Sequence, residues 1–271
     1  MTRMMQVLIM TRRALMISIG LATLAVPAYA DALGDILEQK KIVVGAVNDF
    51  PPFGFLDAEQ VPQGYDIDVA KAIAEKLGVD LELVAVSAAN RIPYLTSKRV
   101  DVLVASLGIT PERAEQVLFT NPYAATQSTV LAPEGTEIRT IEDLVGKRVS
   151  VARGSSNDIF FSSVAPEGVN VMRFDGEGAA SQAMLADQVD ALVITNTMVS
   201  PVAQSRPELK LTTKLLLRQQ ENAIAVRRGE TALAERINAI LEEMKRDGSL
   251  AELYRRWTSA DLPELKARTV Q

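Results

Sequence analysis

Short apolar runs alternate along the chain with longer stretches in which apolar residues recur every three or four positions. The short runs are typical of buried strands, and the longer stretches are typical of amphipathic helices. In the first part of the chain we expect strands at residues 41–47, 81–86 and 100–105. The same pattern predicts helices at residues 66–77, at residues 90–98 and from residue 110 onward.

The alternation restarts after residue 140. Further strands are expected at residues 147–152, 169–174, 189–194, 209–217 and 223–226. Helices are expected at residues 158–164 and 179–186, and two amphipathic helices close the pattern at residues 232–245 and 250–257. Because strands and helices alternate, we expect two α/β units, each with a parallel or mixed sheet and helices on its faces.

Several helix starts carry capping residues. We expect Asp66 to cap the first long helix, with Asp68 as a second helix-start residue rather than the partner in a carboxylate pair. Thr110 precedes Pro111, which suits an N-cap followed by the first helical position. Thr140 and Asp143 have the spacing of a capping box.

Two extended stretches separate the units, at residues 124–133 and 219–222. Two such links between two units predict a hinge that the chain crosses twice. The second unit would then be inserted into the first. This organisation gives a first lobe of residues 31–126 and 220–271 and an inserted second lobe of residues 127–219.

Residues 1–30 have the pattern of a bacterial secretory signal peptide. Arg3, Arg12 and Arg13 precede an apolar run at residues 14–26, and Ala28-Tyr29-Ala30 matches a cleavage site. The run is short for a membrane span, which favours a cleaved signal over a retained anchor helix. We expect a mature periplasmic protein that starts near Asp31, exported by the general secretory route, with the twin-arginine route as the alternative.

Composition narrows the chemistry. The chain has 271 residues, of which 48% are hydrophobic, and it contains neither Cys nor His. Disulfides, cysteine nucleophiles, Ser-His-Asp triads and most zinc sites are therefore excluded. We expect no metal and no cofactor.

Charge argues against nucleic acid as a partner. The chain has 29 Lys and Arg against 34 Asp and Glu, and three of the basic residues but none of the acidic ones lie in residues 1–30. The mature chain would thus carry a net charge of −8. An acidic chain is poorly suited to bind a polyanion through its overall field.

Two strand–loop–helix junctions could bind a small anion, because a helix N-terminus presents free N–H groups. In the first, Gly108 would let a ligand approach the backbone, and the planar guanidinium of Arg113 matches a carboxylate. In the second, the hydroxyls of Ser155 and Ser156 lie beside Asn157. The alternatives are a solvated Arg113 on a helix surface and plain helix capping by the serines.

Six motifs occur in order along nearly the whole mature chain. They are DFPPF at 49–53, GYDIDVA at 64–70, SLGITPER at 106–113, FTNPY at 119–123, GKRV at 146–149 and MKRDG at 244–248. Together they resemble the periplasmic solute-binding proteins of bacterial family 3, which serve polar amino-acid ABC transporters. The resemblance implies a two-lobed type II periplasmic-binding-protein fold, in which each lobe is a mixed sheet flanked by helices and the ligand lies in the cleft.

The resemblance also implies function and partners. The protein would capture a polar amino acid or related small carboxylate and deliver it, as a monomer, to an ABC-transporter permease in the inner membrane. It would not be an enzyme. The residues implied at the ligand are Arg113 for its carboxylate, Phe50 over its aliphatic part, and Ser106, Gly108, Ala152, Ser155, Ser156, Asn157, Thr195 and Arg91.

Two positions depart from the family's pattern. Thr195, followed by Asn196, stands where the family usually has an aspartate for the ligand's ammonium group. A desolvated ammonium needs a carboxylate, so either another acid supplies the charge or the ligand is not a standard α-amino acid. Ala88 stands where binders of basic amino acids place a second aromatic ring, which argues against a stacked Arg or Lys ligand.

Arg91 lies in a segment, residues 90–93, that is similar to one in binders of acidic amino acids, where the arginine reaches the ligand's side-chain carboxylate. It would start a helix and face the cleft, or else lie on that helix's surface. If Arg91 and Arg113 both face the cleft, the ligand should carry two acidic groups, or one acid and a polar amide.

Two other functions remain open at this point. The first is a periplasmic enzyme similar to cyclohexadienyl dehydratase, in which Glu177 or Asp175 would transfer a proton because the chain has no His. The second is a binding protein that presents its ligand-bound state to a membrane receptor.

Overall fold

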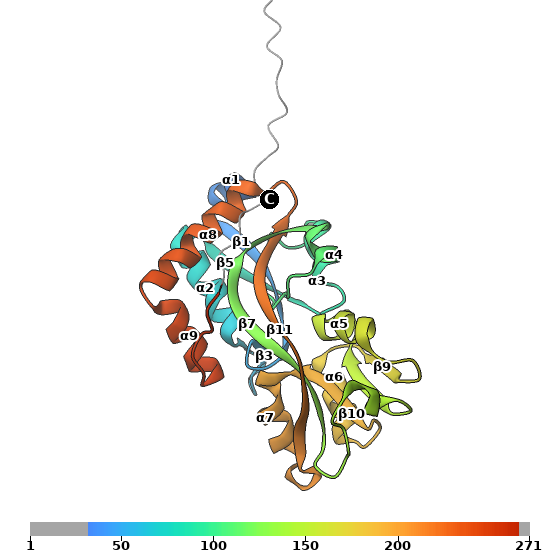
Figure 1. Ribbon diagram of the computed structural model, residues 1–271. Coiled ribbons are helices and arrows are strands. Elements are labelled where there is room, and N and C mark those ends of the chain that lie inside the picture. Colours follow the sequence, from blue (N-terminus) through green and yellow to red (C-terminus); the bar gives the residue numbers. More distant parts are fainter. Residues whose placement is uncertain (1–31, 266–271) are drawn as a thin grey trace, which may run out of the picture.

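The computed structural model describes residues 32–265 and shows two lobes joined by two long strands (Figure 1). The predicted signal peptide, residues 1–30, lies outside the described residues. Within the described range, no helix combines the length and the apolar character that a membrane span requires.

One eight-stranded sheet runs through both lobes, in the order β5-β1-β6-β11-β7-β10-β8-β9. The first lobe contributes three parallel strands, β5 (Asp80–Val86), β1 (Lys41–Val47) and β6 (Val102–Leu103). The second lobe contributes three more, β10 (Ala191–Thr195), β8 (Arg148–Ala152) and β9 (Asn170–Phe174). Each parallel set ends on an antiparallel neighbour from the central pair, β11 in the first lobe and β7 in the second.

The two central strands carry the chain between the lobes. β7 (Val117–Pro133) and β11 (Leu211–Arg227) pair antiparallel along nearly their whole length, with several irregularities of register. In Figure 1 they form a continuous ribbon from the upper body to the lower one. Because this pairing satisfies the backbone of both segments, polar side chains can occupy the crossing.

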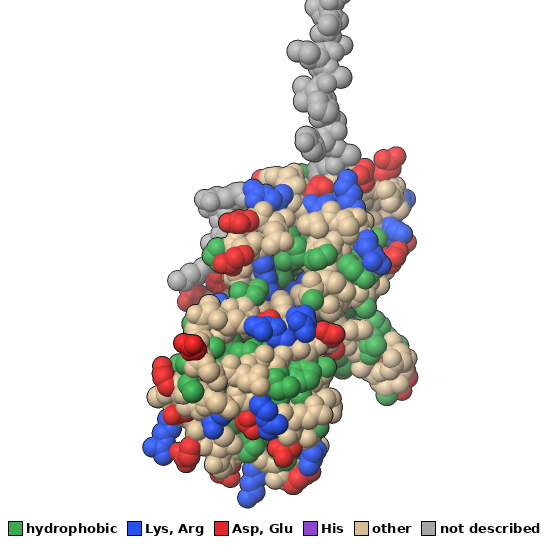
Figure 2. All heavy atoms as spheres, turned by 90° about the vertical axis from the view of Figure 1, so that its right-hand side faces the viewer, with side chains coloured by type: hydrophobic (Ala, Val, Ile, Leu, Met, Phe, Trp, Pro, Cys, Tyr) green, Lys and Arg blue, Asp and Glu red, His purple; other side chains and the backbone are tan. Residues whose placement is uncertain are grey.

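Helices cover the faces of each lobe (Figure 1). Those of the first lobe are α1 (Ala32–Gln39), α2 (Tyr65–Leu77), α3 (Arg91–Thr96), α4 (Pro111–Ala114), α8 (Thr231–Arg246) and α9 (Ser249–Thr258). Those of the second lobe are α5 (Ser156–Val164), α6 (Glu177–Leu185), α7 (Asn196–Ser205) and two short helices at Ile141–Leu144 and Pro207–Leu209. Figure 2 shows the face that carries α3, α4 and α5, with Lys and Arg side chains near the level where the lobes meet.

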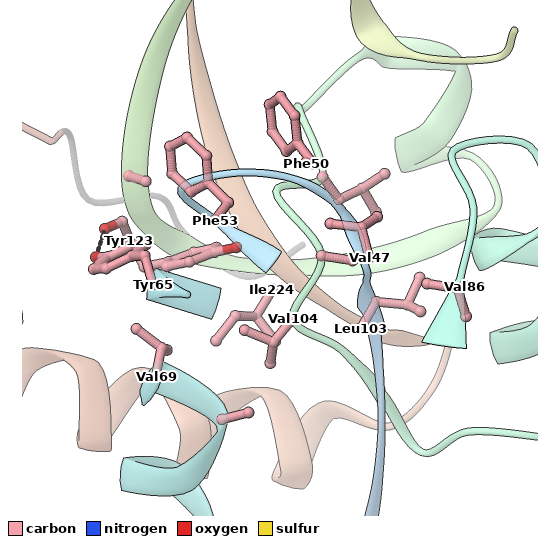
Figure 3. Close-up of a cluster of buried hydrophobic side chains, with 14 of the residues drawn as sticks. Val47, Phe50, Phe53, Tyr65, Val69, Val86, Leu103, Val104, Tyr123 and Ile224 are labelled. Carbon is pink, nitrogen blue, oxygen red and sulfur yellow. Dashed lines mark hydrogen bonds between the residues drawn. The ribbon is translucent and has the colours of Figure 1, made fainter. Parts of the chain in front are cut away.

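A second, small sheet lies beside the cleft end of the first lobe. It consists of β2 (Asp49–Phe50), β3 (Gly54–Leu56) and β4 (Pro62–Gln63). Behind it lies an aromatic core, in which the rings of Tyr65 and Tyr123 stack at 5.6 Å and Phe53 meets Tyr65 edge-on (Figure 3). Phe50 stacks on Phe53 at 5.2 Å, so the core reaches from α2 to the edge of the cleft.

The structure confirms most predicted strands and helices and two of the caps. The Thr110 hydroxyl accepts a hydrogen bond from the backbone N–H of Arg113, and Thr140 and Asp143 form the predicted capping box. The sequence pattern missed α1, α7 and the small sheet. These elements are short or lack a clear apolar period.

Two predictions about local structure are wrong. The predicted extended links at 124–133 and 219–222 do cross between the lobes, as parts of β7 and β11, but the strands predicted at 209–217 and 223–226 are one strand. Asp66 does not cap α2, because Gly64 is the N-cap and Asp66 lies fully buried in the first turn. The division of the lobes near residues 126 and 219, which falls within the central pair, stays a prediction.

Candidate functional site

A polar pocket lies between the lobes, beside the crossing of the central strands. With the lobes together, the cavity in this pocket is small, about 40 Å³, and the pocket is partly open to solvent. Seven of the ten predicted site residues line it, namely Phe50, Arg91, Ser106, Ser155, Ser156, Asn157 and Thr195. Gly108, Arg113 and Ala152 do not line it directly.

The floor of the pocket on the first lobe is Ser106, which follows β6 in a left-handed conformation with φ of 46°. Its hydroxyl donates to Asp66 Oδ2 over 2.7 Å, and its N–H donates to the Tyr123 hydroxyl over 3.0 Å. Tyr123 in turn donates to Asp66 Oδ1 over 2.6 Å. Burial raises the pKa of Asp66 to about 6, although the two hydroxyl donors oppose the shift. The buried carboxyl therefore fixes both the backbone and the side chain of Ser106.

Arg113 ties the lobes together. From α4 its Nη1 donates to Gly108 O over 2.7 Å and to Ser156 Oγ over 2.6 Å, and its Nη2 donates to Gly154 O over 3.1 Å. Only 4% of the residue is exposed, so the alternative of a solvated Arg113 is wrong. All three acceptors are uncharged. Burial is the main cause that lowers the pKa of Arg113 to about 8, and the positive charges of Arg91 and Arg218 add to this effect.

The second lobe meets Arg113 with the start of α5. Ser155 is the N-cap of this helix, and its hydroxyl accepts from the N–H of Asp158 over 3.1 Å, as the capping alternative predicts. Ser156, in contrast, turns its hydroxyl to Arg113. Asn157 donates to Thr195 Oγ1 over 3.3 Å, which joins α5 to the end of β10. Ala152 lies buried at the end of β8, and its carbonyl accepts from the N–H of Ser155.

Gly108 leaves room for two side chains of the site. A Cβ built at this position would overlap Gln220 Nε2 and would lie 2.6 Å from Ser156 Oγ. In this structure the space above Gly108 therefore accommodates Gln220 and Ser156. The idea that Gly108 also lets a ligand approach the backbone stays a prediction.

Arg218 of β11 adds a third cation near Arg113. Its Nη2 donates to Ser156 O over 3.0 Å and to Gln220 Oε1 over 2.6 Å, and its guanidinium lies 4.4 Å from the ring centre of Phe160. Burial lowers the pKa of Arg218. Together with the N-terminus of α5, this makes one side of the site electropositive.

Acids gather on the other side of the pocket. Glu177 is the first residue of α6 and is 8% exposed. Across the cleft, Asp49 of β2 reaches the same helix start, since a Cβ at Gly176 would overlap Asp49 Oδ2. Burial, followed by the charge of Asp49, raises the pKa of Glu177 to about 8, and Arg91 opposes this shift. Both acids line the pocket.

Arg91 begins α3 as predicted and lines the pocket, and at 4% exposure it is not a surface residue. Its Nη1 donates to Ala105 O over 2.6 Å. Burial lowers its pKa to about 10, while Glu177 and other acids, Asp49 among them, raise it. Because Arg91 faces acids of the protein, it does not require a second acidic group on the ligand.

Sequence reasoning missed part of the lining, namely Val47, Asp49, Thr126, Gly176, Gln220 and Asn222. Thr126, Gln220 and Asn222 lie where β7 and β11 cross between the lobes. Their polar side chains within extended segments were the sequence feature that could have indicated a place in the pocket. Glu177 was considered only as the acid of an enzyme. Among residues 32–265, no group of three acidic side chains is arranged to hold a metal ion.

The sequence is similar to those of known proteins. The model of the bacterial extracellular solute-binding proteins, family 3, matches residues 42–260. A curated relative is the ABC transporter glutamine-binding protein of Bacillus subtilis (strain 168), which is 33% identical over 239 residues, covering 86% of this chain and 87% of the relative.

Solved structures are similar as well. An ancestral arginine-binding protein bound to arginine has a TM-score of 0.77 and 38% identity, over 80% of this chain and 98% of its own. An ancestral amino acid-binding protein described as a precursor of cyclohexadienyl dehydratase has a TM-score of 0.76 and 30% identity, over 84% of this chain and 99% of its own. These neighbours show the two-lobed type II periplasmic-binding-protein fold that the motifs implied.

Proposed function

The chain belongs to the bacterial extracellular solute-binding proteins of family 3, and on that basis we propose that it captures a polar amino acid or related small carboxylate in the periplasm. It would deliver this ligand, as a monomer, to an ABC-transporter permease of the inner membrane. The names of its relatives support an amino acid as the ligand, since they bind glutamine and arginine.

The observation that carries this proposal is the separation of charge across the pocket. Arg113 and Arg218 hydrogen-bond to Ser156 at the start of α5, which lines the pocket, whereas Glu177 and Asp49 line it together with Arg91. A zwitterion places one charge on each side. Because these charged side chains are largely shielded from water, solvent screens their attraction to the charges of the ligand only weakly.

Arg113 would bind the carboxylate. Its guanidinium can exchange the neutral acceptors Ser156 Oγ and Gly154 O for a charged one, and charge-assisted pairs of this kind are the stronger hydrogen bonds. Arg113 also contacts both lobes, so a carboxylate bound there would favour their closure. The neighbouring N–H groups of α5 would add further donors.

A thermal-shift screen of the purified protein tests the proposal. The probes are the twenty standard L-amino acids, L-cystine, small dicarboxylates and opines. A ligand at 100 times its Kd stabilises the folded state by about 2.7 kcal/mol, which is readily detected. Stabilisation by at least one amino acid or small carboxylate is expected, and no shift with any probe would contradict the proposal.

We also propose that the site binds without turnover. The observation that favours an enzyme is the raised pKa of the buried Glu177, which suits a proton donor. The structural neighbour related to cyclohexadienyl dehydratase, however, is itself described as an amino acid-binding protein. Incubation of the purified protein with prephenate and with arogenate separates the two functions. We expect both compounds to remain unchanged, whereas conversion of either would favour the enzyme.

A further inference from the structure

We propose that Glu177 and Asp49, one acid from each lobe, form a subsite for an ammonium group of the ligand and supply the negative charge that Thr195 does not. This inference rests on the proposed function and names the residues that recognise a second part of the ligand.

Glu177 provides the first line of support. It is 92% buried, it lines the pocket, and its Oε2 has no hydrogen-bond partner within the described part of the chain. A buried carboxyl oxygen without a donor carries the full cost of its lost hydration. An ammonium group entering the pocket supplies both the missing donor and the opposite charge.

Asp49 provides the second line of support. Its Oδ2 lies 2.1 Å from the position of a Cβ built on Gly176, directly before Glu177 at the start of α6, and Gly176 has a φ of 114°. The glycine thus admits the acid of one lobe to the helix start of the other. The charge of Asp49 raises the pKa of Glu177, so the two carboxylates repel each other, and a cation placed between them would remove that repulsion.

The balance of charges points to a cation. Among the neighbours whose charge acts on Glu177, Asp49 is the acid and Arg91 is the base. With both acids ionised, the three residues carry a net charge of −1, and one ammonium group neutralises them. Burial is the main cause of the raised pKa of Glu177, and a cation bound beside the carboxyl would favour its ionised form.

An organic ammonium fits better than a metal ion. Calcium requires six to eight oxygen ligands and magnesium requires an octahedron. The pocket offers two acids, with Arg91 beside them, and the described residues contain no metal-binding group of three. An ammonium needs only a few acceptors, and it can hydrogen-bond to both carboxylates at once. Its binding would also draw the lobes together.

The ammonium could be the α-amino group or a basic side chain of the ligand, and the test distinguishes them. Amino acids from the thermal-shift screen are titrated calorimetrically, each beside the acid that lacks its α-amino group. Such pairs include L-glutamine with 4-carbamoylbutanoate, and L-arginine with 5-guanidinopentanoate. The proteins are wild type, Glu177→Gln, Asp49→Asn and, as matched control, Asp175→Asn, whose side chain is 92% exposed.

We expect Glu177→Gln to weaken binding of the amino acid by roughly 30-fold or more, as for truncation of one partner in a buried charge pair. Asp49→Asn should weaken it in the same direction, and Asp175→Asn should stay within about threefold of wild type. If the α-amino group is the source, the desamino acid will bind wild type and Glu177→Gln alike. If a side chain is the source, the effect will persist in the desamino acid and will be confined to basic amino acids.

Equal binding by Glu177→Gln and Asp175→Asn, for every amino acid that binds wild type, would overturn the inference and leave the proposed function intact. Failure of every probe to bind wild type would contradict the proposed function, and the inference would fall with it. Circular dichroism checks each fold. Should Glu177→Gln not fold, Asp49→Asn decides the question by the same criterion.

Discussion

The guanidinium of Arg113 on α4 donates a hydrogen bond to the hydroxyl of Ser156 on α5, over 2.6 Å between Nη1 and Oγ. The two residues belong to different lobes and lie 43 positions apart in the chain. This contact lies beside the pocket. A ligand that binds Arg113 therefore also affects how closely the two lobes are held together.

Replacement of Arg113 should abolish most of the binding. Arg113→Ala would leave a desolvated ligand carboxylate without its partner, which costs about 2–5 kcal/mol, or roughly 30-fold to several thousand-fold in Kd. Arg113→Lys should rescue only part of this, because an ammonium lacks the planar fork. The measurement is a calorimetric titration with an amino acid identified in the screen.

The control for this change is Arg139→Ala, which removes a guanidinium that is 83% exposed and should leave Kd unchanged. Because Arg113 is buried and makes three hydrogen bonds, Arg113→Ala should also melt at a lower temperature than the control. Binding by Arg113→Ala within about threefold of wild type would place the carboxylate elsewhere.

Gly108→Ala should weaken binding and leave the fold intact. The added Cβ would displace the ends of Gln220 and Ser156, which are side-chain atoms that can move, from the wall of the pocket. Loss of one or two polar contacts corresponds to roughly 5- to 100-fold in Kd, again by calorimetry. Gly135→Ala is the matched control, since a Cβ there meets nothing within 4 Å. Equal Kd values for both variants would show that the wall at Gly108 plays no part.

Ligand binding should make the molecule more compact. The chain passes between the lobes through the paired strands β7 and β11, whose irregular register allows the ribbon to bend. We expect the radius of gyration from small-angle scattering to fall when the protein is saturated with an amino acid that stabilises it. An unchanged radius with that same compound would mean that the lobes do not move.

The pH should influence closure of the ligand-free protein through Glu177. With the lobes together, burial and Asp49 raise the pKa of Glu177 from 4.5 to about 8, against the effect of Arg91. With the lobes apart, solvent would return the pKa toward its ordinary value. Below about 4.5 the group is protonated in both arrangements and does not oppose closure; between 4.5 and 8 its opposition grows with pH.

The ligand-free protein should therefore be more compact at about pH 5 than at about pH 8, by small-angle scattering. Glu177→Gln, which cannot ionise at this position, should show a flatter dependence on pH. If the compactness of wild type and variant changed equally with pH, titratable groups other than Glu177 would be responsible for the change.

Sequence reasoning predicted the elements whose periodic pattern is local. α2 and α8 were recognised because their buried faces recur at helical spacing, and the caps at Thr110 and Thr140 were recognised because their signals lie within four residues. The continuity of β11 was missed. Its polar middle, Gln219 to Asn222, is stabilised by pairing with β7, which is distant in sequence.

Prediction of the site from the sequence was likewise limited to features that are local in the chain. Residues beside a recognisable motif, such as Ser106 and Ser156, were expected near the ligand and do line the pocket. Asp66 was taken for a cap because its type and position suit one. Only the fold brings Ser106 and Tyr123 to its carboxyl oxygens. Likewise, Asp49 and Glu177 lie far apart in sequence and meet only across the lobes.

The proposed ligand is a zwitterion whose carboxylate binds Arg113. The most direct measurement is a calorimetric titration of the wild-type protein with an amino acid from the screen and with the same compound as its carboxamide, for example L-glutamine and L-glutaminamide. The carboxamide keeps the ammonium group and loses the negative charge, so we expect it to bind roughly 30-fold more weakly or worse. Equal affinity for the two compounds would mean that the protein does not recognise the negative charge of the ligand's carboxylate.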